Sequence, residues 1–213
     1  MKKLLLLLVL MSSSSICFAQ YGYRDSNRIG VVIGANQFSL NTSNFSTKPD
    51  LGWNAALSVR GNFYDNWDMV YAIQFSENNF SVATNNGANA KEDVNYKLSS
   101  AQISLQLSYV IIENHLSFEF GPLMQVNGKL KIDPTKENNI ITGTTVFAKD
   151  IVDISKFNFY PTVGLTAGVK HFRLNVSYQY GLNNMLKNLN NNNIGSNFKG
   201  NPGIVNGTII LYL

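Results

Sequence analysis

Apolar and polar residues alternate through most of the chain. The pattern is clearest in AQISLQLSYVIIENHLSFEF, residues 101–120, where apolar residues fill every second position on both sides of a short polar break. A period of two residues is typical of a β-strand with one apolar face and one polar face. The stretch therefore predicts two strands joined by a tight turn at Glu113-Asn114-His115.

The same period recurs along the chain and predicts eight strands. Besides the pair within 101–120, strands are expected over residues 29–38, 51–63, 68–80, 158–170, 172–182 and 204–213. No segment reads as an amphipathic helix of useful length. Beyond the N-terminal run, no stretch reaches the ~18 consecutive apolar residues that suggest a spanning helix. We therefore expect an all-β chain.

The links between the strands alternate in length. Short links follow the second, fourth and sixth strands, and long, Asn-rich links follow the others, at 39–50, 81–95, 131–157 and 183–203. Outer-membrane barrels have short periplasmic turns at one end and longer extracellular loops at the other. The final strand also ends with the chain, as in membrane barrels. The layout predicts an eight-stranded antiparallel up-and-down transmembrane β-barrel over residues 29–213.

The N-terminus has the features of an export signal. Lys2 and Lys3 precede an apolar run from Leu4 to Met11, and small residues follow up to Ala19. This predicts a signal peptide at 1–19, then a short periplasmic segment at 20–28, and location in the bacterial outer membrane. A spanning helix needs ~20 apolar residues, more than this run has. Cys17 suggests a lipoprotein signal as an alternative, but bulky Ile16 stands where a small residue is expected.

Composition narrows the class of protein. Cleavage after Ala19 removes the only cysteine, so the mature chain can form no disulfide. Charged residues make up 14% of the chain, against the ~25% usual in soluble domains. Cleavage also removes two of the 17 basic residues, which leaves 15 against 13 acidic ones and a scattered charge of +2. That small excess gives no support for binding to nucleic acid.

A soluble barrel of the lipocalin kind is the main alternative fold. It would turn its apolar face inward and a charged face to water. The polar faces here consist of Ser, Thr, Gln, Asn and Gly with few charges. The apolar faces carry aromatic residues toward strand ends, as interfacial girdles do: Trp53, Trp67, Tyr109 and Tyr180. These features favour a membrane barrel whose apolar residues face outer-membrane lipid.

Strand direction and parity place several charged residues inside the barrel, near its periplasmic end. We expect a lumenal charge network of Arg60, Asp68, Glu119, Lys170 and Arg173. Within it, Glu119 should pair with Arg60 or Lys170, because an unpaired buried charge is costly. The alternative is that some of these charges lie at a water-exposed rim. An eight-stranded barrel is narrow enough for side chains to fill, so we predict a polar, plugged lumen that is no general diffusion pore.

Candidates for chemistry are few. His115 and His171 fall in predicted turns, with no Ser or carboxylate at a spacing that suggests a nucleophile and base. The sequence has no zinc pattern, and loop carboxylates such as Asp133 and Glu137 leave a hard-cation site as a weak alternative. We therefore predict a non-enzymatic, monomeric barrel without cofactors. The loop 131–157 contains ITGTTVFAKDIVDI, a β-prone run expected to extend the barrel and offer a strand edge to a protein partner.

One hairpin carries a family resemblance. GLTAGVKHFRLNVSYQYGLNNM, residues 164–185, resembles the penultimate hairpin of the PorT-like outer-membrane β-barrel proteins of Bacteroidetes, as do Gly121-Pro122 and the Asp65-Asn66 turn. Leu213 departs from the terminal aromatic residue common there. The resemblance implies a barrel, and one branch of the family is implicated in protein secretion. Four functions follow as hypotheses: a structural or binding role through the long loops, which we favour, a part in a secretion or envelope-assembly machine, a lipid A-modifying enzyme, and a soluble ligand carrier.

Overall fold

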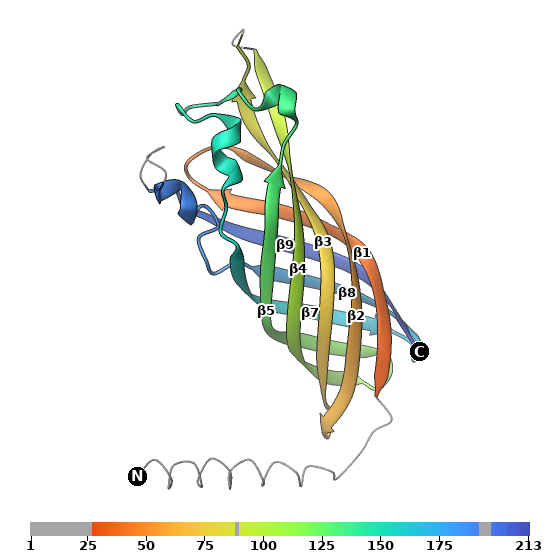
Figure 1. Ribbon diagram of the computed structural model, residues 1–213. Helices are drawn as coiled ribbons and strands as arrows, with labels where there is room; N and C mark the ends of the chain where they lie inside the picture. The colour runs from red at the N-terminus through yellow and green to blue at the C-terminus, as the bar shows by residue number, and fades with distance from the viewer. Residues whose placement is uncertain (1–26, 88–89, 192–196) are drawn as a thin grey trace, which may run out of the picture.

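The computed structural model describes residues 27–87, 90–191 and 197–213. Within these ranges one antiparallel sheet contains β1 (Arg28–Thr42), β2 (Thr47–Tyr64), β3 (Trp67–Asn85), β4 (Lys91–Ile112), β5 (Leu116–Lys131), β6 (Ile140–Ile141), β7 (Phe157–Gly168), β8 (Phe172–Tyr180) and β9 (Gly200–Tyr212). The order is β2-β1-β9-β8-β7-β5-β4-β3, and β3 also pairs with β2, so eight strands close into a ring (Figure 1). The predicted eight-stranded up-and-down β-barrel is confirmed. The expected signal peptide at 1–19 lies outside the described residues.

The faces of the barrel wall point as the alternation predicts. In β4, Ile103 and Leu105 are each 45% exposed on the outside, whereas Ser104 and Ser108 are buried inside. β1 repeats the pattern, with Ile29 and Ile33 exposed. A closed ring pairs the backbone groups of neighbouring strands, which is the condition for crossing hydrocarbon with strands. The outside of this part of the barrel is therefore a lipid-facing wall.

Two of the expected loops are mostly strand. The predicted links at 39–50 and 81–95 shrink to residues 43–46 and 86–90, because β1, β2, β3 and β4 all continue past the predicted ends. The β3–β4 hairpin rises beyond the rest of the barrel wall in Figure 1. We call residues 77–85 of β3 and 91–99 of β4 the extension.

The strands continue there because their two faces exchange character. On β3 the outward residues change from Tyr71, Ile73 and Phe75 to Glu77 and Asn79. On the inside of the same strand, polar residues give way to Phe80 and Val82, which are 1% and 0% exposed. Water replaces lipid outside the extension, so a polar outer face and an apolar inner face become the stable arrangement.

Irregularities in strand pairing lie at the same height. The register of β2 against β3 shifts between Pro49 and Trp53, and that of β4 against β5 shifts between Leu98 and Ser100. Bulges bend strands and increase their local twist. The lipid-facing wall therefore ends where both the pairing and the polarity of the faces change.

An apolar core fills the lumen above this height. Phe80 stacks on Tyr96 at 5.2 Å between ring centroids, and Phe38 lies 5.5 Å from Phe80. We call the whole buried cluster the apolar plug: Phe38, Leu40, Phe45, Phe80, Val82, Val94, Tyr96, Leu98, Leu123, Leu130, Ile141, Val146, Ala148, Ile151, Ile154, Tyr160, Met185, Leu186, Leu189, Phe198 and Ile204. The expectation of a polar lumen is wrong for this half of the barrel, because two connections fold inward and supply apolar side chains.

The β-prone run adds a short strand to the sheet, and the protein partner expected at its edge stays a prediction. It forms a short pairing of β6 with β3, in which Ile141 faces Thr84, and then the 3-10 helix η3 (Ala148–Val152). The side chains of Ile141 and Ile151 are buried in the apolar plug, and Tyr96 Oη donates to the Ala148 carbonyl at 2.9 Å. The 3-10 helices η2 (Pro134–Lys136) and η4 (Lys187–Asn191) complete the two connections. The segment 131–157 therefore covers the barrel.

Replacing Ile151 by Ala should loosen this cover without opening the wall. Ile151 is 1% exposed, and truncating a buried Ile to Ala costs about 2–5 kcal/mol. We expect trypsin to cut the folded variant faster after Lys136 and Lys149 than it cuts the unmodified protein. Ile140→Ala is the control, since Ile140 is 42% exposed, and equal cleavage of both variants would contradict the plug.

Candidate functional site

A cluster of buried charges closes the short-turn end of the lumen. Arg60 of β2 is 1% exposed, Asp68 of β3 is 2% exposed and Glu119 of β5 is 4% exposed. Arg60 Nη1 donates to Asp68 Oδ2 at 3.1 Å, and Nη2 pairs with Glu119 Oε1. Three of the residues predicted for the charge network therefore meet, and Glu119 has Arg60 as its partner.

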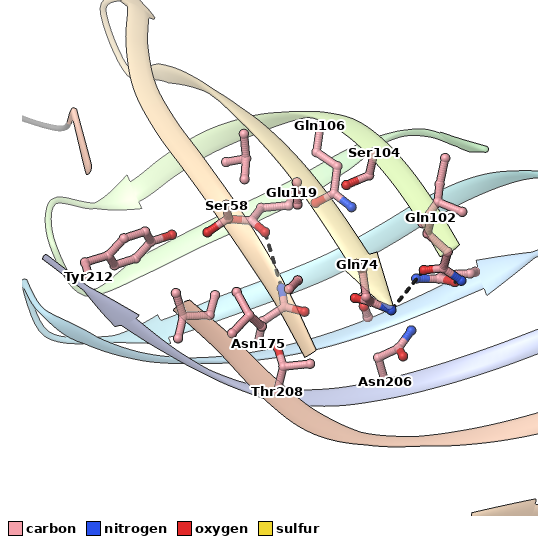
Figure 2. Close-up of a pocket in the computed structure, with 18 residues that line it drawn as sticks. Ser58, Gln74, Gln102, Ser104, Gln106, Glu119, Asn175, Asn206, Thr208 and Tyr212 are labelled. Atoms are coloured by element: carbon pink, nitrogen blue, oxygen red, sulfur yellow. Dashed lines mark hydrogen bonds between the residues drawn. The ribbon is translucent and has the colours of Figure 1, made fainter. Parts of the chain in front are cut away.

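Neutral groups complete the bonding of this ion cluster. Arg60 Nε donates to Tyr212 Oη at 3.1 Å, and Arg60 Nη1 donates to Ser108 Oγ at 2.9 Å. Asn175 Nδ2 donates to Glu119 Oε2 at 3.3 Å, as Figure 2 shows. Buried ions are tolerated when their remaining donors and acceptors are satisfied in this way.

Two further arginines lie beside this cluster. Arg173, from the predicted network, is 5% exposed and lies 5.6 Å from the centroid of the Tyr212 ring. Arg28 is 6% exposed and donates from Nη1 to the Lys170 carbonyl at 2.6 Å and from Nη2 to Asn114 Oδ1 at 3.0 Å. We call these five residues the charged layer: Arg28, Arg60, Asp68, Glu119 and Arg173. Because Arg28 bridges two turns, the layer also ties the short-turn end together.

The prediction that Lys170 faces the lumen is wrong. β7 ends at Gly168 and β8 begins at Phe172, so Lys170 lies in the turn between them, and its side chain is exposed. The predicted strand continued to residue 170. Alternate residues face opposite sides only within a strand, and β7 ends at Gly168. Arg28 is a further basic residue that faces the lumen at this end. It lies an even number of residues from the other inward positions of β1, so the alternation in the sequence could have revealed it.

Amide side chains fill the middle of the lumen. Gln74 Nε2 donates to Gln102 Oε1 at 2.9 Å, and Gln102 Nε2 donates to Gln125 Oε1 at 2.6 Å. Figure 2 shows Gln74, Gln102 and Asn206 among the side chains that line a cavity here. Its polar lining and its size suit bound water. The charged layer, the amides and the apolar plug follow one another along the lumen.

The four predicted girdle aromatics lie on the outer face. Trp53, Tyr109 and Tyr180 are 53%, 40% and 42% exposed. Trp67 is half-buried and lies 5.0 Å from Tyr109 between ring centroids, near the short turns. Trp53 pairs in register with Glu77, at the upper limit of the lipid-facing wall. Their interfacial role stays a prediction.

The two histidines lie in or beside the short turns. His115 Nδ1 lies 2.8 Å from the Glu113 carbonyl, and His171 Nδ1 lies 3.2 Å from the Tyr212 carbonyl. In the described ranges, His, Cys, Asp and Glu form no group of three that could hold a metal ion. Over the same residues, no helix is long and apolar enough to span a membrane.

This combination of a lipid-facing wall and a filled lumen defines a small outer-membrane β-barrel protein. A family model described as "Outer membrane protein beta-barrel domain" matches residues 18–187, and the chain belongs to that family. A search of curated proteins finds no match.

Solved structures share the fold at low identity. Ail, the attachment invasion locus protein of Yersinia pestis, solved in complex with the heparin analogue sucrose octasulfate, is 12% identical, with a TM-score of 0.51 over 88% of this chain and 99% of that chain. OprG from Pseudomonas aeruginosa is 10% identical, with a TM-score of 0.49 over 90% and 98% of the two chains. Neisserial surface protein A is 12% identical, with a TM-score of 0.48 over 86% and 96%. At this identity the likeness to Ail shows the fold alone.

Removing the Glu119 carboxylate should destabilise the barrel. Glu119→Ala leaves Arg60 with Asp68 as its remaining acidic partner, and breaking a buried ion pair costs about 3–5 kcal/mol. We expect a lower urea midpoint for the variant in detergent micelles. Glu113→Ala, in an exposed turn, should leave the midpoint unchanged, and equal midpoints for Glu119→Ala and the unmodified protein would remove the stabilising role of the charged layer.

Proposed function

We propose that the protein is a non-enzymatic binding protein that acts through the extension and the connections above the membrane. The observation that carries this proposal is the filled lumen, which holds the charged layer, the amide side chains and the apolar plug in succession. A barrel filled in this way offers no route for a solute. We therefore place its activity on its outer surfaces.

The surface of the extension is held in place by ion pairs. Lys48 Nζ lies 2.5 Å from Asp93 Oδ2, and Lys136 Nζ lies 2.6 Å from Glu92 Oε1. The hydrogen bond from Lys136 lowers the pKa of Glu92, so this carboxylate stays ionised at neutral pH. A hollow beside these pairs is lined by Lys48, Thr84, Lys91, Asp93 and Thr142, among others. A surface fixed before binding loses less entropy when a ligand orders it.

A part in a secretion or envelope-assembly machine is the second candidate. The PorT-like pattern of residues 164–185 favours it, since one branch of those proteins is implicated in secretion. Such a role would use the periplasmic side, where Arg28 joins the turns at Asn114 and Lys170. The two candidates therefore place the partner at opposite ends of the barrel.

The filled lumen makes a direct prediction about conduction. We expect the purified protein, folded in planar bilayers, to show no stable single-channel current. Heat-modifiable migration on a gel verifies folding before the recording. Steady openings that scale with salt concentration would show a continuous water path and would overturn the proposal.

Site-specific photo-crosslinking in cells locates the partner. We expect a crosslinker placed at Thr142, beside the extension, to give a discrete adduct, and one placed at Glu113, in a short turn, to give none. The reverse result, with an adduct at Glu113 alone, would replace the binding proposal by the machine component. A crosslinker at the wall position Leu105 controls for contact with lipid and neighbouring barrels.

A further inference from the structure

Three outward lysines lie together at the upper edge of the lipid-facing wall. Lys97 of β4 and Lys131 of β5 are paired in register, and Lys129 precedes Lys131 on β5 at the irregularity in pairing. All three side chains are exposed. We call Lys97, Lys129 and Lys131 the lysine patch.

The lysine patch brings like charges together. Residues directly opposite on antiparallel strands have Cβ atoms about 4.5–5.5 Å apart, and like charges at such positions are destabilising. Among the described residues, no ion pair or hydrogen bond engages the ammonium groups of the patch. The chain thus maintains a repulsion that a neutral residue at any of the three positions would reduce.

Three other lysines of the upper half of the barrel have side-chain partners within the described residues. Lys48 is paired with Asp93, Lys136 is paired with Glu92, and Lys149 Nζ donates to Asn138 Oδ1 at 3.0 Å. Near the patch, Glu77 lies outward on β3, but it faces Ser99 in register and accepts a bond from Asn79. The patch therefore differs from single exposed lysines in grouping three positive charges, an arrangement that an external anion would stabilise.

The position of the patch identifies the source of that anion. Val126 and Met124, directly below it on β5, are 43% and 47% exposed on the lipid-facing wall. Lys129 lies three residues beyond Val126, about 10 Å along the strand, which a tilt of about 40° reduces to roughly 8 Å of height. The polar headgroup region spans about 5–8 Å beyond the hydrocarbon on each side. Flexible lysine side chains can therefore reach the headgroups.

We propose that the lysine patch binds the phosphate groups of lipids that carry a net negative charge in the surrounding membrane leaflet. Three ammonium groups supply several hydrogen-bond donors and compact positive charges for phosphate oxygens. The exposed apolar side chains directly below contact the acyl chains of the same lipid molecules. A soluble anion would gain only the first of these two contacts. This site is separate from the extension hollow, so it can exist whether or not the proposed binding function is correct.

Thermal unfolding in defined vesicles tests the site. The full-length protein is folded into dioleoylphosphatidylcholine vesicles with or without a minority of dioleoylphosphatidic acid, and the midpoint is read from heat-modifiable migration. We expect the anionic lipid to raise the midpoint by about 2–4 °C, and high salt to weaken the effect. The variant Lys97→Gln/Lys129→Gln/Lys131→Gln should lose the rise, while in pure phosphatidylcholine its midpoint should equal or exceed that of the unmodified protein.

Two further variants control for charge and folding. Lys91→Gln/Lys187→Gln/Lys199→Gln removes the same charge from exposed positions elsewhere and should keep the rise, as should replacement of all three patch lysines by Arg. A patch variant that keeps the rise, or a control that loses it equally, would overturn the proposal. An equal rise with inorganic phosphate in phosphatidylcholine vesicles would assign the site to a soluble anion and overturn the lipid assignment.

Discussion

The long strands β3 and β4 meet two solvents along their length, and the arrangement of their side chains follows from that constraint. In hydrocarbon the backbone must pair within the sheet, and the side chains outside must be apolar. Above the hydrocarbon, water makes a polar outer face stable, and apolar residues move inside. β3 contains both situations, with Phe75 outward near its middle and Phe80 inward a few residues later. The pairing of β3 with β4 is continuous while the apolar side changes.

The contents of the lumen follow the same change of solvent. Where the wall faces lipid, the inside carries amides, the charged layer and a small apolar cluster that includes Val32, Ala56 and Ile210. Where the wall faces water, the inside resembles the core of a soluble protein, with Tyr96 and Phe80 stacked and the connection 132–156 folded over them. Side chains therefore fill both halves of the lumen, polar ones mostly in one half and apolar ones in the other.

Much of this arrangement was predictable from the sequence, because a period of two fixes which side chains share a face. The orientation of Ile103 against Ser104 and the meeting of Arg60, Asp68 and Glu119 follow from parity and strand direction alone. The extension was missed because its outward residues are polar and rich in Asn, a composition that also characterises loops. Lys170 was misplaced because the end of β7 depends on the turn to β8, and the plug was missed because its members come together only in the tertiary structure.

Residue-by-residue accessibility along β3 is the most direct test of the exchange between its apolar and polar faces. Spin labels placed singly from Met69 to Asn85 can be measured for collision with oxygen, which concentrates in lipid, and with a water-soluble nickel complex. We expect the odd positions up to Phe75 to favour oxygen and the odd positions from Glu77 onward to favour nickel, with Phe80 and Val82 shielded from both. Oxygen accessibility at odd positions that continues to the end of the hairpin would contradict the account.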